Sequence, residues 1–153
     1  MKTLSRILRA AIVIATLSPC ASAQWNQSNG PEGGQLSGLL HDGTFLYAGG
    51  RDGVYRSMND GDTWQPANGG MWPWTYVFTV ARNGGTLLAG TFNEGIYRST
   101  DDGDIWFQRN TGLPEYAQVR AICATGGKFL CGAGGSIYAS NDDGMSWSKS
   151  AVG

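Results

Sequence analysis

Residues 98–106 read RSTDDGDIW, with acidic residues and a glycine between a serine and a tryptophan. Closely similar strings occur at residues 56–64 (RSMNDGDTW) and 139–147 (ASNDDGMSW). The serines of the three strings are 42 and 41 residues apart. A period of about 40 to 45 residues is typical of β-propeller blades that contain four strands each. The spacing of this string therefore predicts a propeller.

The sequence around the three strings repeats in step with them. The stretches LSGLLHDGTFLYAG (36–49), VFTVARNGGTLLAG (77–90) and VRAICATGGKFLCG (119–132) each contain an apolar run, a turn with glycine and a second apolar run, which indicates a β-hairpin. A third short strand follows (GVYRS, GIYRS or SIYAS), and a fourth begins after the acidic string. No helical periodicity is found after residue 23. The predicted fold is all-β, with three four-stranded antiparallel sheets as blades of an incomplete propeller ring.

Every residue type in the acidic string has a structural role in a turn between the third and fourth strands. Glycine tolerates positive φ, and the tryptophan anchors the small hairpin to its neighbours. The Asn or Asp side chain is expected to bond to backbone NH groups two residues on, and the serine hydroxyl to close the turn from the other side. The twelve residues predicted to act in this way are Ser57, Asn59, Gly61, Trp64, Ser99, Asp101, Gly103, Trp106, Ser140, Asp142, Gly144 and Trp147.

The pattern Ser-x-Asp-x-Gly-x-x-Trp resembles the Asp-box of bacterial neuraminidase repeat proteins. That group includes sialidases, xyloglucan-degrading propellers, sortilin-type receptors and photosystem assembly factors. The resemblance covers residues 24–153 in three copies, with Asn59 where the family has aspartate. It implies that the boxes lie at the periphery of the blades, away from the ligand face. A sialidase also needs an arginine triad, a Tyr–Glu pair and an Arg-Ile-Pro motif, and the sequence contains no Arg-Ile-Pro.

The acidic strings also raise the question of a metal site. Calcium bound at residues 60–62 or 102–104 is the alternative to a purely structural turn, but the ligand pattern of an EF-hand is absent. We therefore predict no metal and no other cofactor.

The first 23 residues have the features of a secretory signal peptide. Basic residues precede a short apolar core over residues 10–17, and small residues over 21–23 form a cleavage site. A lipoprotein with Cys20 as the lipidated residue is the alternative, although Pro19 is a poor neighbour for that modification. The apolar core is too short to span a bilayer. We expect a secreted or periplasmic protein with no membrane span, in which residues 24–153 form the three-blade segment.

The charge of residues 24–153 argues against two classes of partner. This segment has twelve acidic and eight basic side chains, a net charge of −4 with histidine neutral. The basic residues are spread singly, so no basic patch is expected. Nucleic acid and anionic membrane surfaces are therefore not predicted partners.

Two cysteines follow the signal segment, Cys123 and Cys131. An oxidising compartment permits a disulfide between them. With a two-residue turn at residues 126–127, however, Cys123 would lie opposite Leu130, so that a bridge needs a longer turn or a bulge. The alternative is that both are small apolar strand residues.

The segment WNQSNG (25–30) matches WQPANG (64–69) and indicates a fourth strand at Trp25 without the first three strands of its blade. Closed propellers usually have four to eight blades, so three blades do not form a ring. Either the chain is the start of a longer protein, or copies assemble into a homo-oligomeric ring. The additional strand favours the first alternative, because a dimer of complete blades would contain two surplus fourth strands.

The predicted connectivity brings two sets of loops to one face. These are the loops between the second and third strands and the loops between blades, and both sets vary most among the repeats, as functional loops do. Rings beside polar groups suit sugar or peptide binding, whereas the alternative is that Trp72 and Trp74 fill gaps between blades. The candidate ligand-binding residues are Trp72, Trp74, Tyr76, Phe92, Glu94 and Tyr116.

Catalysis has little support in the sequence. Asp52, Glu94 and Glu115 are the carboxylates expected on this face, and a glycosidase needs two at a defined separation. The single histidine, His41, is expected near a turn on the opposite face, which argues against a Ser–His–Asp triad. We therefore predict a non-catalytic binding or scaffold module for a glycan or an extracellular protein. A fragment of a sialidase- or xyloglucanase-like glycoside hydrolase is the alternative, and a purely structural repeat module is the third.

Overall fold

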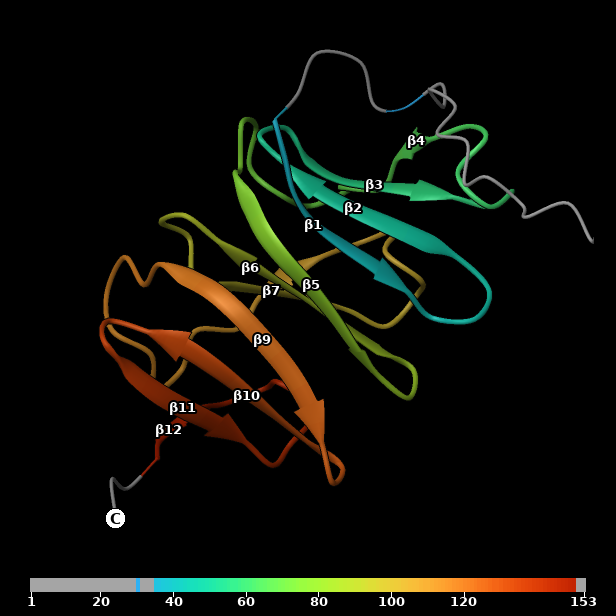
Figure 1. Ribbon diagram of the computed structural model, residues 1–153. Helices are drawn as coiled ribbons and strands as arrows, with labels where there is room; N and C mark the ends of the chain where they lie inside the picture. Colours follow the sequence, from blue (N-terminus) through green and yellow to red (C-terminus); the bar gives the residue numbers. More distant parts are fainter. Residues whose placement is uncertain (1–29, 31–34, 151–153) are drawn as a thin grey trace, which may run out of the picture.

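The computed structural model describes residue 30 and residues 35–150, which contain twelve β-strands and no helix (Figure 1). The all-β prediction is therefore confirmed. Within these residues no helix is present that would be long and apolar enough to cross a membrane. The predicted strand at Trp25 and the signal peptide over residues 1–23 lie outside the described residues.

The strands form three antiparallel sheets of four consecutive strands each, which are the three predicted blades. The first blade contains β1 (Leu36–His41), β2 (Leu46–Gly50), β3 (Gly53–Ser57) and β4 (Gln65–Pro66). The second contains β5 (Val77–Asn83), β6 (Thr86–Thr91), β7 (Ile96–Ser99) and β8 (Phe107–Gln108). The third contains β9 (Val119–Thr125), β10 (Lys128–Ala133), β11 (Ser136–Ser140) and β12 (Ser148–Lys149).

The blades lie side by side, with the second between the first and the third (Figure 1). Strand β1 contacts β5, and β5 contacts β9, so the first strands of the three blades are neighbours. The short fourth strands lie at the other edge of each sheet. This order places the loops of equivalent type from successive blades on the same end of the structure.

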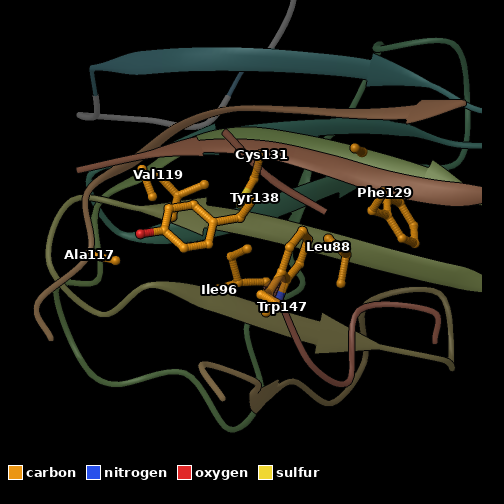
Figure 2. Close-up of a cluster of buried hydrophobic side chains, with 10 residues drawn as sticks. Leu88, Ile96, Ala117, Val119, Phe129, Cys131, Tyr138 and Trp147 are labelled. Carbon is orange, nitrogen blue, oxygen red and sulfur yellow. The ribbon is translucent and has the colours of Figure 1, made fainter. Parts of the chain in front are cut away.

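Two apolar cores hold the blades together, one on each side of the second blade. Leu87 and Leu88 are adjacent on β6 and point into different cores, because side chains alternate between the two faces of a strand. The core between the first two blades contains Tyr47, Val54, Ala67, Val77, Val80, Leu87, Ala89, Tyr97 and Trp106. The core between the last two, drawn in Figure 2, contains Ala81, Leu88, Ile96, Ala117, Val119, Phe129, Cys131, Ala133, Tyr138 and Trp147.

The three acidic strings form equivalent turns, which we call the repeated turns (residues 57–64, 99–106 and 140–147). In the second of them the Ser99 hydroxyl accepts a hydrogen bond from the Gly103 NH at 3.0 Å and donates one to the Asp101 carboxylate at 2.6 Å. Gly103 has a φ of +88°, as predicted for this position. The other two turns repeat both contacts.

The predicted partner of the Asn or Asp side chain was wrong. Asp101 accepts from the NH of Ile105, four residues on, at 3.0 Å, and not from the NH two residues on. The NH two residues on belongs to Gly103 and is already bonded to the Ser99 hydroxyl. The serine hydroxyl thus accepts from the NH group that is nearer in sequence. The carboxylate accepts from the NH group two residues further on, just before the tryptophan. The first and third turns show the same arrangement.

The tryptophans of the second and third repeated turns join their blade to the linker that precedes it. Trp106 is almost fully buried, and its indole NH donates to the carbonyl oxygens of Ala67 at 2.8 Å and Gly103 at 2.9 Å. Trp147 is also buried and donates to the carbonyl oxygen of Arg109. Trp64 of the first blade is only partly buried and bonds within its own turn, to Gly61.

The two cysteines are not bridged. The turn between β9 and β10 has two residues, and Cys123 lies opposite Leu130, as the register argument predicts. Cys131 is buried in the core, and burial raises the pKa of its thiol to about 12. Cys123 is exposed.

Candidate ligand-binding face

The six predicted binding residues line two separate pockets on the same end of the structure, and Tyr116 also lines a third hollow of about 920 Å³. Trp74, Tyr76 and Phe92 line a hollow of about 620 Å³ together with Arg51 and Asp52 from the loop between β2 and β3. The other three predicted residues, Trp72, Glu94 and Tyr116, line a second hollow of about 570 Å³. The structure therefore divides the predicted set into two groups of three.

Trp74 and Tyr116 have the same place in successive inter-blade loops and share two unusual properties. Their side chains are 82% and 75% exposed, respectively. Their φ angles are +64° and +52°, in the left-handed region. For a bulky residue this conformation is a genuine outlier and costs roughly 1–2 kcal/mol. Trp72 is 66% exposed, so neither predicted tryptophan is buried between blades.

A β-bulge in the first strand of each blade adds three residues that the predicted set of binding residues does not contain. The register shifts at Ser37 in β1, at Phe78 in β5 and at Arg120 in β9, which are equivalent positions. The Ser37 hydroxyl donates to the Tyr76 hydroxyl at 2.9 Å. Bulges re-aim side chains, and they are over-represented next to active sites. Here they bring three unlike side chains into the neighbourhood of the aromatic pocket.

Phe78 is the centre of the resulting aromatic cluster. Its ring lies 4.7 Å from that of Tyr76 and 5.9 Å from that of Phe92, measured between centroids. The Arg120 guanidinium carbon lies 4.8 Å from the Phe78 centroid, which is within the range of a cation–π contact. The cluster joins residues of the second and third blades. The signal in the sequence was that the second position of the first strand differs in all three repeats (Ser, Phe, Arg).

The carboxylates of this face are also divided between the pockets. Glu94 and Glu115 line the same hollow, whereas Asp52 lines the neighbouring one. The loop that carries Glu94 is ordered by the Thr91 hydroxyl, which accepts from the Glu94 NH at 3.0 Å and donates to the Gly95 carbonyl oxygen at 2.9 Å. His41 ends β1 next to the hairpin turn, as expected. Among residues 30 and 35–150, no three His, Cys, Asp or Glu side chains are placed to hold a metal ion.

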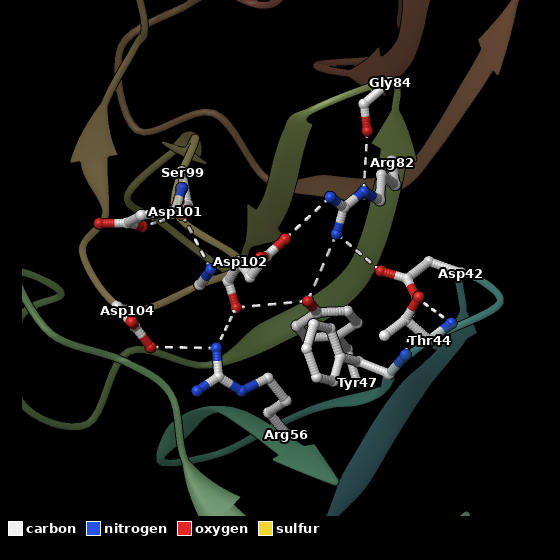
Figure 3. A network of polar contacts seen from close by, with 12 residues as sticks. Asp42, Thr44, Tyr47, Arg56, Arg82, Gly84, Ser99, Asp101, Asp102 and Asp104 are labelled. Carbon is white, nitrogen blue, oxygen red and sulfur yellow. Dashed lines mark hydrogen bonds and ion pairs between the residues drawn. The ribbon is translucent and has the colours of Figure 1, made fainter. Parts of the chain in front are cut away.

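A polar network joins the first two blades at the repeated turn (Figure 3). The Arg82 guanidinium forms ion pairs with Asp42 at 2.6 Å and with Asp102 at 2.8 Å. Burial raises the pKa of Asp42, but hydrogen bonds from the backbone and from Arg82 outweigh it, so the pKa lies below its ordinary value. Burial raises the pKa of Tyr47, whose hydroxyl is in the same network, to about 12. Through Asp102, the second repeated turn therefore takes part in the contact between the first and second blades.

The chain resembles known proteins in its fold, and no family is shown by its sequence. No family model matches the sequence. No curated protein matches it either. Several solved structures have the same fold.

YCF48 from Cyanidioschyzon merolae is 18% identical with a TM-score of 0.62, and the match covers 76% of this chain and 37% of that one. YCF48 bound to a D1 peptide is 20% identical with a TM-score of 0.68, with 79% and 42% covered. The GH74 xyloglucanase from Xanthomonas campestris is 18% identical with a TM-score of 0.59, with 76% and 22% covered. The chain thus spans less than half the length of each. At these identities the likeness shows the fold alone, and the described residues are three blades of a β-propeller.

Proposed function

We propose that this chain is a non-catalytic binding module that holds a glycan or a segment of an extracellular protein on the face carrying Trp74 and Tyr116. The observation that carries the proposal is the conformation of these two residues. Each presents a large ring to solvent from a left-handed backbone. Strain of this kind clusters at ligand clamps, where it pre-organises the site.

The chemistry of the face suits either class of ligand. An aromatic ring stacks on the apolar face of a sugar or on a peptide side chain, and it loses little conformational entropy on binding. Arg51, Asp52 and Glu94 stand beside the rings and supply groups that orient a ligand. Among the proteins of the same fold, one structure of YCF48 is bound to a D1 peptide and another protein is a xyloglucanase. Both classes of ligand are thus known on this fold.

We also propose that the chain belongs to the Asp-box family and is located outside the cytoplasm. The contacts among serine, glycine and Asp or Asn in the repeated turns, made in the same way three times, support the family assignment. The signal segment over residues 1–23 is the basis for a secreted or periplasmic location. Fractionation of cells that express the full chain, with N-terminal sequencing of the product, tests the cleavage before Gln24.

Binding is tested on arrays of glycans and of peptides, followed by calorimetry with the best ligand. Trp74→Ala and Tyr116→Ala are expected to weaken binding by a few kcal/mol, as anchors at binding surfaces do. Phe107→Ala is the matched control, because Phe107 is also an exposed ring but lies on the outer strand β8. An equal loss of affinity in the control, or no ligand on either array, would contradict the proposal.

A glycoside hydrolase is the second candidate, and one observation favours it. Glu94 and Glu115 line a common pocket, and two carboxylates that flank a bond are what a glycosidase needs. Release of reducing sugar from soluble polysaccharides, abolished by Glu94→Gln and by Glu115→Gln, would support this candidate. Binding without release supports the non-catalytic module.

A further inference from the structure

The face of the third blade that points away from the second is apolar and exposed. Ile137 on β11 is 58% exposed, whereas Val54 on β3 and Ile96 on β7, at the equivalent positions, are 0% exposed. The equivalence follows from the register, since each of the three pairs with a glycine of the preceding strand. Val54 and Ile96 belong to the cores against the next blade. Ile137 would do the same if another blade followed in space.

The glycines paired with Val54 and Ile96 show how the next blade packs against this face. A Cβ on Gly49 would lie 2.7 Å from Cγ1 of Val77, and a Cβ on Gly90 would lie 2.6 Å from the carbonyl oxygen of Val119. Val77 and Val119 are the first residues of β5 and β9, so each glycine leaves room for the first strand of the next blade. Gly132 has the same position on β10, but no described residue lies within 4 Å of its Cβ position. Among the described residues, this position of the third blade is therefore not covered.

The first blade, at the other end of the row, contains the residue equivalent to Val77 and Val119. Leu36 begins β1 and has the place of Val77 and Val119, as the equivalent bulges show. Both valines are fully buried, whereas Leu36 is 41% exposed. The first and third blades lie on opposite sides of the second (Figure 1). The structure therefore has an open docking position at one end and an exposed apolar first strand at the other.

We propose that the outer face of the third blade docks the first blade of a second copy of this chain, with Leu36 of one copy against Gly132 of the other. With the three described blades of each copy, two copies joined in this way at both ends bring together six blades, which lies within the four to eight blades of closed propellers. The strand predicted at Trp25, which would be surplus in such a dimer, lies outside the described residues and is not part of this count. A head-to-tail contact that closes after two copies gives a ring rather than a filament.

The contact is expected to be more apolar than the two inter-blade contacts inside the chain. Arg56 and Arg98 each bond to the repeated turn of the following blade. Ala139 has the equivalent position on β11, so this polar contact is not repeated at the outer face. Cys123 is exposed in the first strand of the third blade, at the position where Ala81 of the second blade packs against β9–β12. Its thiol therefore reports directly on whether the face is covered.

The first experiment measures mass against concentration by analytical ultracentrifugation, on protein expressed from the full 153-residue sequence. We expect a dimer that dissociates on dilution, with slower alkylation of Cys123 in the dimer than in the monomer. Gly132→Leu should raise the dissociation constant roughly a hundredfold, because a side chain fills the docking position. Gly85→Leu is the matched control, since Gly85 is also open and also lacks a positive φ. A protein that stays monomeric at high concentration would overturn the proposal.

The second experiment tests the direction of the contact. Ile137→Asp and Leu36→Asp each place a charge on one of the two faces, and each should yield a monomer, since burying an unpaired charge is costly. A mixture of the two variants has one intact pair of faces and should form a mixed dimer through that pair. If Leu36→Asp remains dimeric while Ile137→Asp is monomeric, the third blades pair with each other and the head-to-tail proposal is wrong. Circular dichroism of each variant shows that the blades remain folded.

Discussion

Arg56 on β3 donates a hydrogen bond of 2.7 Å to the backbone carbonyl oxygen of Asp102, which lies in the repeated turn of the next blade (Figure 3). Arg98 on β7 makes the same contact one blade later, with the carbonyl oxygen of Asp143 at 2.7 Å. Both acceptor residues have a φ of +56°. The left-handed residue of each turn is therefore a docking point for the arginine of the preceding blade. The repeated turn connects two strands and also joins two blades.

Removing the second of these contacts should loosen the third blade. Arg98→Ala is expected to lower the free energy of unfolding by about 1–2 kcal/mol, the usual contribution of a charge-assisted hydrogen bond that is partly exposed. Lys128→Ala, which removes an exposed cation of the third blade, is the control and should change it by less than about 0.5 kcal/mol. Urea denaturation followed by tryptophan fluorescence measures both. Equal effects of the two substitutions would contradict this role of Arg98.

The third repeated turn should make stability depend on pH. Hydrogen bonds from Ser146 and then from Ser140 lower the pKa of Asp142 from 3.8 to about 2. Because the folded pKa is the lower one, the stabilisation is complete above the unfolded value and is lost as the pH falls through the folded value. We therefore expect the free energy of unfolding to decrease between about pH 4 and pH 2. Asp142→Asn should remove part of this decrease.

The same substitution should leave the turn intact at neutral pH. The first turn has Asn59 in this place, and its side-chain oxygen accepts from the Thr63 NH at 3.0 Å, as Asp142 accepts from the Ser146 NH. Urea titrations of the wild type and of Asp142→Asn at several pH values between 2 and 7 are the measurement. An identical pH dependence in the two proteins would show that Asp142 does not contribute to it.

A glycine in the second inter-blade loop should be intolerant of any side chain. Gly112 has a φ of +89°, and a Cβ on it would collide with the carbonyl oxygen of Trp147. Gly43 has a similar φ of +95° but open space around it. Gly43→Ala should therefore cost only the conformational strain, roughly 1–2 kcal/mol. Gly112→Ala should cost several kcal/mol, because backbone must also move. Thermal unfolding of both variants separates the two contributions, and equal costs would contradict the collision.

The sheets were predictable because their determinants are local. The period of the repeated turns gave the number of blades, and the hairpin pattern gave the strand order within each. The alternation of side chains in a strand was enough to place Cys123 opposite Leu130 and to argue against a disulfide. The partner of Asp101 was not predicted correctly, because spacing does not show which of two acceptors binds the Gly103 NH.

The binding face was predictable only in part. Trp74 and Tyr116 were identified because aromatic residues interrupt a repeat that is otherwise regular. Ser37, Phe78 and Arg120 were not in the predicted set, because a bulge is defined by pairing register, and its signal in the sequence is only a position that differs among the three repeats. Contacts between blades were missed for a similar reason. They join residues about one repeat apart, and no local pattern encodes which side chain meets which turn.

The backbone strain at Trp74 yields the sharpest test of the binding face. Glycine adopts a φ of +64° without the penalty that tryptophan incurs, and the exposed ring makes few contacts that would be lost. Trp74→Gly should therefore keep or raise the free energy of unfolding, by up to about 1 kcal/mol, while it abolishes ligand binding. Phe107→Gly, in an extended strand, should instead lower stability by roughly 0.5–1 kcal/mol and leave binding unchanged. Chemical denaturation and calorimetry on both variants measure the two quantities. If Trp74→Gly were clearly less stable than the wild type, the ring would be a packing element and the strain at this position would have no role in binding.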